Sequence, residues 1–324
     1  MNKLSNFVDK FKGKKVLVYG DVMLDLYIRG EVERISPEAP VPVIMERSRE
    51  YVLGGAGNVA ANIASLGGAV TLVGVIGNDA EGNIVRDVCG KFGIDARLVS
   101  EEDRPTAVKA RAVAKRHQLL RIDREKTGAI SKATEKKIIS LLAGIRDFDA
   151  VVISDYTKGC IVPEVTAFIK KHFAGKKIIA GIKPAGAVLF KDVETVVLNL
   201  KEAHAVTGMH GDSNSAATDV VSRLSRELAS SVVLTRGEYG MTAFDKKDRK
   251  VSHVPTRAAQ VYDVTGAGDT VLALLALMLA SGASLSEAAE VANHAAGVVV
   301  GLEGTATLTP DELKKALLDH NYRA

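Results

Sequence analysis

The chain has 324 residues, of which 47% are hydrophobic and 25% are charged, with a formal net charge of +4 from 43 Lys and Arg against 39 Asp and Glu. These proportions are typical of a globular protein with a sizeable core, and they exclude a mainly disordered chain or a fibrous repeat. No dense Lys/Arg stripe indicates nucleic-acid binding, while the small positive charge still permits anionic ligands.

Short β-branched runs alternate with helical stretches along most of the chain. The strands that we expect are residues 15–19, 70–76, 150–154, 177–180, 195–198 and 232–235. The helices that we expect are residues 58–66, 80–92, 131–145, 163–173, 271–280 and 285–300, and a last one that begins at the capping box of residues 309–312. This alternation predicts an α/β fold: a doubly wound, mostly parallel sheet with helices on both faces.

Two segments break the alternation. Residues 26–49 carry three prolines between positions 37 and 42, and residues 104–123 alternate polar with apolar side chains and are rich in bases. Both patterns are typical of antiparallel ribbon. Because we find no Ser/Gly-rich linker, internal repeat or low-complexity tract, we expect one domain over residues 1–324 with a small β-ribbon lid made by these two segments.

The sequence also bears on where the protein works. The longest apolar run, residues 271–280, is about half of what a bilayer span needs, and the charged N-terminus has no apolar stretch of the kind found in signal peptides. Cys89 and Cys160 have no CxxC or His-rich partner, so we interpret them as small, partly buried hydrophobic residues. We therefore expect a cytoplasmic protein with no zinc site and no membrane partner.

The strongest chemical signal is Asp263-Val-Thr-Gly-Ala-Gly-Asp269, directly before an apolar helical run. Gly266 and Gly268 allow close approach of the backbone to a ligand, and the free N–H groups at a helix N-terminus form a site for an anion such as phosphate. Asp269 is unfavourable there unless it has a task, such as accepting a proton from an attacking hydroxyl. The alternative is that Asp269 only caps the helix.

A second glycine-rich segment runs from Gly54 to Asn62. It contains the spacing of a dinucleotide fingerprint, but it lies after the first βα turn, and the next expected strand lacks the following acidic residue that binds ribose. We interpret it as a glycine turn that brings Asn58 and backbone amides to a polyhydroxylated ligand. Tight helix–sheet packing by Gly and Ala is an alternative that is compatible with this one.

Polar residues also follow three expected strands, at the edge where open α/β sheets bind ligands. Asp21 ends the first strand, with Asp25 four residues on, and a carboxylate there can accept two hydrogen bonds from a sugar. Asn199 and Glu202 could face a metal-bound phosphate through waters, and Lys158 could contact an anionic part of a substrate. Taken singly, such residues are more often loop carboxylates, first-turn helix acids and exposed lysines.

In order, the segments at Gly54–Asn58, Asn199–Glu202 and Asp263–Asp269 resemble the ribokinase-like (PfkB) sugar kinases, over essentially the whole chain. P-loop, GxSxG, HExxH and protein-kinase motifs are absent. Within the family, the segments that begin at Gly20, Gly54 and Gln118 resemble the heptose 7-phosphate kinases. The run RISPEAPVPVI from Arg34 is the most discriminating part of this narrower resemblance.

The resemblance implies a role for each candidate residue. Asp269 would be the catalytic base, with an anion hole formed by Gly266, Ala267 and Gly268. The residues that would hold the sugar are Asp21, Asp25, Gly54, Gly55 and Asn58. Magnesium would be organised by Asn199 and Glu202 through water, and these two also belong to the cofactor site. The other residues of the nucleotide site would be Thr235, Gly237, Asp263, Thr265, Asn293 and Gly304.

The implied reaction transfers the γ-phosphoryl group of ATP to the anomeric hydroxyl of D-glycero-D-manno-heptose 7-phosphate, for ADP-heptose and lipopolysaccharide core synthesis. ATP and Mg²⁺ would be the cofactors, and a monovalent cation is a further candidate. The bases that could bind the 7-phosphate are Lys109, Arg111, Arg121 and Lys158, with Arg34 reaching across a dimer clasp. We expect a homodimer through the lid, and a separate nucleotidyltransferase downstream because the chain ends after one capped helix.

Two departures from the family pattern leave other functions open. Gly181-Ile182-Lys183 stands where such heptose kinases usually carry Asp-Pro-Lys, and Leu302-Glu303-Gly304 stands where they carry Lys-Leu-Gly. A kinase of another sugar or sugar phosphate is therefore the main alternative. A non-catalytic sugar-phosphate sensor is less favoured, because a sensor does not need Asp269 as a base, and a nicotinamide enzyme is the least favoured.

Overall fold

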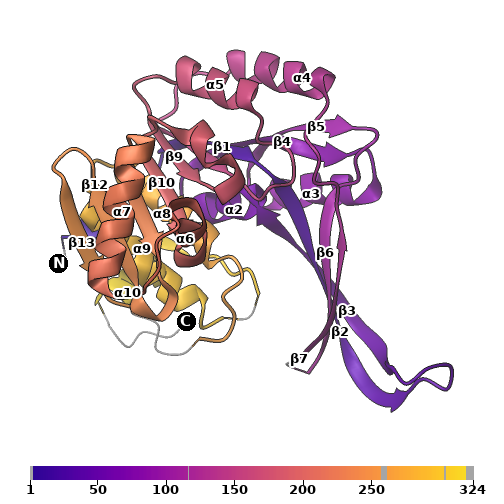
Figure 1. The fold of residues 1–324 in the computed structure, drawn as a ribbon. Helices are drawn as coiled ribbons and strands as arrows, with labels where there is room; N and C mark the ends of the chain where they lie inside the picture. The colour runs from indigo at the N-terminus through magenta and orange to yellow at the C-terminus, as the bar shows by residue number, and fades with distance from the viewer. Residues whose placement is uncertain (1–2, 116, 257–260, 303, 319–324) are drawn as a thin grey trace.

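The computed structural model describes residues 3–115, 117–256, 261–302 and 304–318. Figure 1 shows a body of helices packed around a large sheet, and a narrow second sheet that projects away from this body. Among the described residues no helix combines the length and the apolar character needed to cross a membrane. Cys89 and Cys160 are buried and not disulfide-bonded, as predicted.

The large sheet has nine strands in the order β13-β12-β11-β10-β9-β8-β1-β4-β5 among the described residues. Neighbouring strands are parallel except for the antiparallel pairs β11–β12 and β12–β13. The strands are β1 Lys15–Gly20, β4 Ala69–Gly77, β5 Asp95–Glu101, β8 Ala150–Ser154, β9 Lys177–Gly181, β10 Thr195–Asn199, β11 Ser231–Thr235, β12 Met241–Asp245 and β13 Lys250–Val254. The predicted α/β sheet is confirmed.

Helices cover both faces of this sheet (Figure 1). They are α1 Ser5–Val8, α2 Ala56–Ser65, α3 Ala80–Lys91, α4 Lys132–Ala143, α5 Pro163–His172, α6 Leu200–Thr207, α7 Asn214–Leu228, α8 Ala267–Ala280, α9 Leu285–Val299 and α10 Pro310–Leu318, with 3-10 turns η1 Pro184–Phe190 and η2 Gly237–Tyr239. Along β1, Val16 and Val18 pack in the core with α2, α8 and α9, while Leu17 and Tyr19 pack in the core with α4, α5 and α7. Each inner strand is therefore apolar at consecutive positions, because both of its faces are covered.

The projecting sheet has the strand order β3-β2-β6-β7. Its strands are β2 Val22–Ile35, β3 Pro42–Gly55, β6 Ala107–Ala114 and β7 His117–Arg124. The predicted ribbon is antiparallel within each hairpin, but β2 and β6 pair in parallel, which joins the two hairpins into one sheet. β2 begins two residues after β1 ends, and β3 runs directly into α2, so the projecting sheet is continuous with the carboxyl edge of the main sheet.

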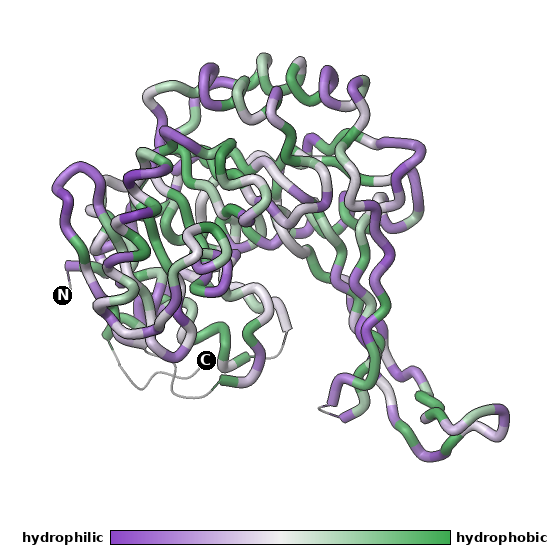
Figure 2. The backbone as a smooth tube through the Cα atoms, viewed as in Figure 1, coloured by the Kyte–Doolittle hydropathy of each residue, from purple (hydrophilic) through white to green (hydrophobic). Residues whose placement is uncertain are grey.

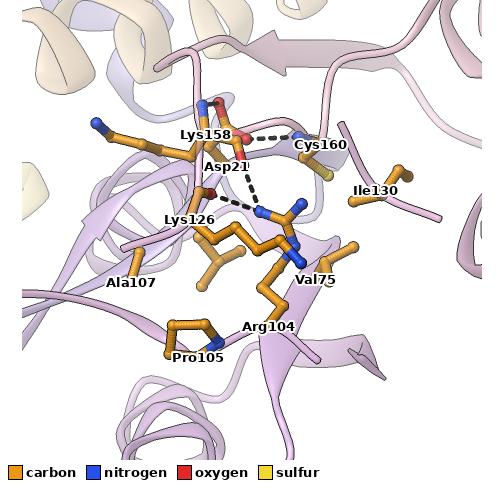
Figure 3. Close-up of a pocket in the computed structure, with 10 residues that line it drawn as sticks. Asp21, Val75, Arg104, Pro105, Ala107, Lys126, Ile130, Lys158 and Cys160 are labelled. Atoms are coloured by element: carbon orange, nitrogen blue, oxygen red, sulfur yellow. Dashed lines mark hydrogen bonds between the residues drawn. The ribbon is translucent and has the colours of Figure 1, made fainter. Parts of the chain in front are cut away.

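A buried arginine ties this part of the chain to the body. Arg104 was expected in the lid segment, yet its guanidinium is buried and donates from Nε to Glu101 Oε2 at 2.7 Å. Its other nitrogens donate to the backbone carbonyls of Lys126, Gly128 and Lys158, around a cavity of about 20 Å³, roughly the room for one water molecule (Figure 3). Arg104 is thus the shared donor for two loops.

We predict that Arg104→Met lowers the free energy of unfolding by about 3 kcal/mol, because it leaves buried carbonyls and Glu101 without a donor. Urea unfolding followed by circular dichroism measures this value. Arg223→Met, which removes an exposed ion pair to Glu227 on α7, is the matched control and should cost less than about 1 kcal/mol. Equal losses in the two variants would contradict the role of Arg104 as the shared donor for the two loops.

Candidate active site

Polar residues gather where the carboxyl ends of the central strands face the start of α8. β1 lies between β4 and β8, so the strand order reverses at β1, and the edge beside such a reversal is where open α/β sheets bind ligands. Gly266 caps α8 with a φ of +82°, and Asp269 lies in the first turn with 3% of its surface exposed. The motif that predicted the site therefore does open a helix at this edge.

Two side-chain donors hold the Asp269 carboxylate. Asn58 Nδ2 donates to Oδ2 at 2.9 Å, and Tyr156 Oη donates to Oδ1 at 2.7 Å. Burial raises the pKa of Asp269 to about 6, the two donated hydrogen bonds and Lys183 act in the opposite direction, and Asp25 adds to the increase. A buried carboxylate with this pKa is ionised at neutral pH. Because its pKa lies close to neutral pH, it can also take up a proton during the reaction.

The orientation of Asn58 is set by a chain of neighbours in α2 and α8. Asn62 Nδ2 donates to Asn58 Oδ1 at 3.1 Å, and Thr270 Oγ1 donates to Asn62 Oδ1 at 3.0 Å. Because Asn58 Oδ1 is already used as an acceptor, its N–H group is the one that faces Asp269. Asn58 was predicted to hold a sugar; the structure shows that its amide group holds the expected base.

The two glycines of the motif differ in their surroundings. A Cβ at Gly266 would lie 2.7 Å from Asn58 Nδ2, so a side chain there would displace the donor of the base. A Cβ at Gly268 would meet no atom within 4 Å, so the backbone faces open space there. The N–H of Ala267 donates to the Val264 carbonyl across 3.4 Å, which leaves Gly268 as the best placed of the predicted anion-hole residues.

Two cavities meet at Gly268. The larger one measures about 630 Å³, a size that suits a nucleotide, and the smaller one about 160 Å³. Asn199 and Thr235 line both cavities as well, so the wall between them consists of strand ends and the start of α8. The larger cavity has an apolar wall at Met241, Val261, Val264, Val271 and Val300.

The predicted nucleotide residues fall into two groups. Thr235, Gly237 and Asn293 line the larger cavity, and Asn293 Nδ2 also donates to the Pro255 carbonyl at 2.7 Å. Asp263, Thr265 and Gly304 do not line this cavity, and their role in the nucleotide site stays a prediction. Asp263 accepts the N–H of Thr265 at 2.8 Å on Oδ1 and that of Gly304 at 3.2 Å on Oδ2, so its carboxylate ties the motif loop to the loop after α9.

Asn199 and Glu202 form a capping box at the start of α6. Asn199 Oδ1 accepts the N–H of Glu202 at 2.8 Å, and Glu202 Oε2 accepts the N–H of Asn199 at 2.9 Å. The second carboxylate oxygen of Glu202 accepts a hydrogen bond from Lys183 Nζ. The described residues contain no group of three His, Cys, Asp or Glu placed to hold a metal directly.

Asp21 has a different role from the one predicted. Its carboxylate accepts three backbone N–H groups. Oδ2 accepts that of Tyr156 at 2.8 Å. Oδ2 also accepts that of Lys158 at 3.0 Å, and Oδ1 accepts that of Cys160 at 2.9 Å (Figure 3). It is 2% exposed, and it shapes the loop after β8 instead of reaching toward a sugar. A residue type alone does not distinguish these roles, because both use a carboxylate at a strand end.

Asp25 is the carboxylate near Asp269. It accepts a hydrogen bond from Arg111 Nη1 at 2.5 Å, and a Cβ at Gly54 would lie 2.8 Å from its Oδ2. Gly54 therefore leaves room for Asp25, and Gly55, with a φ of +56°, makes the turn into α2. The predicted sugar residues are thus adjacent, although Arg111 neutralises Asp25 and does not extend outward as an anion-binding base.

Three of the remaining bases, Lys109, Arg121 and Lys158, have acidic partners. Lys158 Nζ lies 2.6 Å from Glu125 Oε1, and Lys109 Nζ lies 3.6 Å from Glu125 Oε2 and 3.2 Å from Asp123. Arg121 is half-exposed and pairs with Asp123. Lys109 and Lys158 come from different elements and converge on one carboxylate. Arg34 lies in the exposed outer half of β2, whereas Lys109 and Lys158 are half-buried.

Sequence reasoning missed Tyr156 and the pairing of Lys183. Tyr156 lies in the predicted strand-end segment Ser154–Lys158, where Lys158 drew attention because of its charge. A tyrosine at a strand end carries no signal by itself, since its partner is 113 residues away. At the departure Gly181, a Cβ would lie 2.5 Å from Leu272 Cδ1, so α8 occupies the space of a side chain.

An α/β sheet of this kind, with a buried carboxylate and a helix N-terminus beside a cavity of nucleotide size, is the arrangement of a phosphotransferase. Comparison with known proteins agrees. The family model of the pfkB family carbohydrate kinases matches residues 13–312, so the chain belongs to that family and is a sugar kinase.

Curated relatives narrow the comparison. The bifunctional protein HldE of Paramagnetospirillum magneticum is 39% identical over 98% of this chain, and that of Caulobacter sp. (strain K31) is 42% identical over 94%. The chain spans 66% and 62% of the lengths of these two proteins.

Solved structures show the same fold. A ribokinase of Arabidopsis thaliana, complexed with ribose and ATP, superimposes with a TM-score of 0.73 at 23% identity, over 94% of this chain and 99% of that one. Phosphofructokinase-2 of Escherichia coli superimposes with a TM-score of 0.79 at 20% identity, over 94% of this chain and 98% of that one. The ribokinase-like fold predicted from the sequence is thereby confirmed.

Proposed function

We propose that this sugar kinase transfers the γ-phosphoryl group of ATP to the anomeric hydroxyl of D-glycero-D-manno-heptose 7-phosphate. The observation that carries the proposal is the buried carboxylate of Asp269, held by two donors at the start of α8 beside Gly268. Phosphoryl transfer mainly needs positioning, neutralisation of charge and a group that accepts the proton of the attacking hydroxyl. This site offers all three.

In the proposed reaction the anomeric oxygen attacks the γ-phosphorus, and its proton moves to Asp269. The bond from the γ-phosphorus to the β,γ-bridging oxygen breaks, and ADP leaves with the electron pair. Gly268 presents its N–H at the positive end of α8 to the transferring group. The cavity of about 630 Å³ would hold the nucleotide, with its apolar wall against the base and Thr235 toward the phosphates.

Magnesium would bind mainly through phosphate oxygens and water. Asn199 and Glu202 face the smaller cavity but are bound to each other and to Lys183, so they fit an ion held through water and do not supply a direct ligand set. The ion would neutralise charge on the transferring phosphates. A monovalent cation stays a prediction.

The choice of a phosphorylated sugar rests on the projecting sheet and on the relatives. Lys109 and Lys158 converge on Glu125, and this arrangement supports an anion site between them. The 7-phosphate would take the place of that carboxylate, while Asp25 would accept sugar hydroxyls. HldE proteins about 40% identical to this chain support the heptose assignment. The product would be the 1,7-bisphosphate for ADP-heptose and lipopolysaccharide core synthesis, with a nucleotidyltransferase acting downstream.

We predict that Asp269→Asn lowers kcat at pH 7.5 by roughly 100- to 10,000-fold with heptose 7-phosphate and Mg-ATP, because it removes the proton acceptor. In the wild type, kcat/KM should fall below about pH 6, where Asp269 becomes protonated. ADP release, coupled to NADH oxidation, measures both. Wild-type rates in Asp269→Asn would contradict the proposal, and activity confined to ribose, fructose or fructose 6-phosphate would keep the mechanism but reject the heptose substrate.

We predict that Lys158→Met raises KM for heptose 7-phosphate about tenfold or more and changes kcat little, because a charge-assisted contact to the distal phosphate is lost. Lys177→Met removes an exposed ion pair on β9 and is the matched control with an expected unchanged KM. Initial rates at varied concentrations of heptose 7-phosphate give KM and kcat for each variant. An unchanged KM in Lys158→Met would show that the phosphate binds elsewhere.

We also propose that the projecting sheet acts as a lid and as a dimer clasp. Its exposed large apolar side chains are Val32, Ile35, Val41, Met45, Leu119, Leu120 and Ile122. Hydrophobic and hydrophilic stretches alternate along this sheet (Figure 2). Water contact with these side chains is unfavourable, and a second copy of the chain offers the same apolar surface. In such a dimer Arg34 could reach the partner's substrate.

The double substitution Leu120→Lys and Ile122→Lys should convert the dimer into a monomer, because both residues lie on one face of β7 and would bring like charges together. Light scattering after size exclusion measures the mass. Val188→Lys, an equally exposed apolar position on η1, is the control that should stay dimeric. A wild-type protein that is monomeric at tens of micromolar would contradict the clasp.

A further inference from the structure

Tyr156 contacts the proposed base, yet the reaction described above gives it no role. It lies in the loop between β8 and α5, and its hydroxyl donates to Asp269 Oδ1 at 2.7 Å. Burial, together with the neighbouring Asp269, raises the pKa of Tyr156 well above its ordinary value. The hydroxyl therefore stays protonated, and it can only donate toward an ionised Asp269, because a carboxylate only accepts.

The loop that carries Tyr156 is held on both sides of the residue. Asp21 Oδ2 accepts the N–H groups of Tyr156 and Lys158, and Asp155 Oδ1 accepts that of Thr157 at 2.7 Å. Thr157 has a φ of +54°, a left-handed conformation that these hydrogen bonds maintain. The buried Asp21 thereby acts on the base through the position of Tyr156.

The aromatic ring of Tyr156 also contacts Lys183. The Lys183 ammonium lies 5.1 Å from the ring centroid and also bonds to Glu202. Tyr156, Lys183 and Gly268 line the same cavity of about 160 Å³. Tyr156 therefore contacts both the proposed base and Lys183, which lies on the wall of this cavity.

We propose that Tyr156 is a positioning residue of the phosphoryl-transfer site, whose hydroxyl holds Asp269 oriented and ionised so that the carboxylate accepts the proton of the sugar. This inference rests on the proposed function of Asp269. A hydrogen bond donated to the charged form of an acid favours that form. The groups that face Asp269 are Tyr156, Asn58 from α2, Asp25 from β2 and Lys183 after β9. Of these, Asp25 opposes ionisation, whereas Tyr156, Asn58 and Lys183 favour it.

The test is the pH profile of kcat/KM for heptose 7-phosphate with Mg-ATP in Tyr156→Phe. Losing a hydrogen bond to a charged group should move the acid limb to higher pH by about one unit. At pH 6 the variant should then be about fivefold slower than the wild type, and the deficit should close above pH 8. Substrate phosphates titrate in the same range for every variant, so only differences between variants are compared.

Tyr19→Phe is the matched control. Tyr19 is also buried, and its hydroxyl donates to the carbonyl of Cys160 in the same loop, but it does not touch Asp269. It should lower thermal stability without moving the acid limb. An equal loss at every pH in Tyr156→Phe, or an unmoved limb, would overturn the proposal and leave Tyr156 a structural role only.

Two further variants keep the outcome interpretable. Tyr156→Gln retains a side-chain N–H donor that does not titrate, so its acid limb should lie between those of the wild type and Tyr156→Phe. It also serves if the phenylalanine variant does not fold. Asp269→Asn separates the two proposals: if this variant keeps wild-type activity, the proposed base fails, whereas an inactive Asp269→Asn with an unmoved limb in Tyr156→Phe rejects only the tyrosine.

Discussion

A carboxylate buried at the start of a helix is the constraint on which the rest of the site depends. Removing an ionised group from water is costly unless donors replace the water. Asn58 and Tyr156 supply one hydrogen bond to each oxygen of Asp269, and neither donor could be placed by its own element alone. The geometry of the base is therefore a property of three distant segments of the chain.

Each of the two donors depends on another layer of contacts. Asn58 is oriented by Asn62 and Thr270, which ties α2 to α8. Tyr156 is oriented by Asp21, at the junction between β1 and the projecting sheet. β2 continues from that junction and β3 leads into α2, so a movement of the projecting sheet would shift both Tyr156 and Asn58. If this sheet closes over a sugar as proposed, the closure would also alter the hydrogen bonds that these two residues donate to Asp269.

Most of the fold could be predicted because local sequence and tertiary environment agree. β8 at residues 150–154 is a β-branched run covered on both faces, and α8 is preceded by its own capping motif. The antiparallel edge strands β12 and β13, and the helices α6 and α7, were not predicted. The four elements pack against α9 and η1. The caps at Asn199 and Ser213 are nevertheless local signals for the starts of α6 and α7.

The site was predicted in part for the same reason. Asp269, Asn58 and Gly268 belong to short glycine-rich motifs, in which Gly266 has a φ of +82° that favours glycine. For Asp21 and Asp263 the structure shows carboxylates that accept backbone N–H groups, and such a carboxylate has the same sequence signature as one that binds a ligand. The role of Tyr156 depends on a partner far along the chain, which only the folded arrangement reveals.

The central claim is that Asp269 is ionised yet poised to take up a proton, and a carbon-13 NMR titration of aspartate-labelled protein tests it most directly. The spectrum of Asp269→Asn identifies the resonance of the Asp269 carboxyl carbon. We predict a midpoint near pH 6, because burial raises the pKa of this group to about 6. A midpoint near pH 4, the ordinary range of an exposed aspartate, would contradict the account.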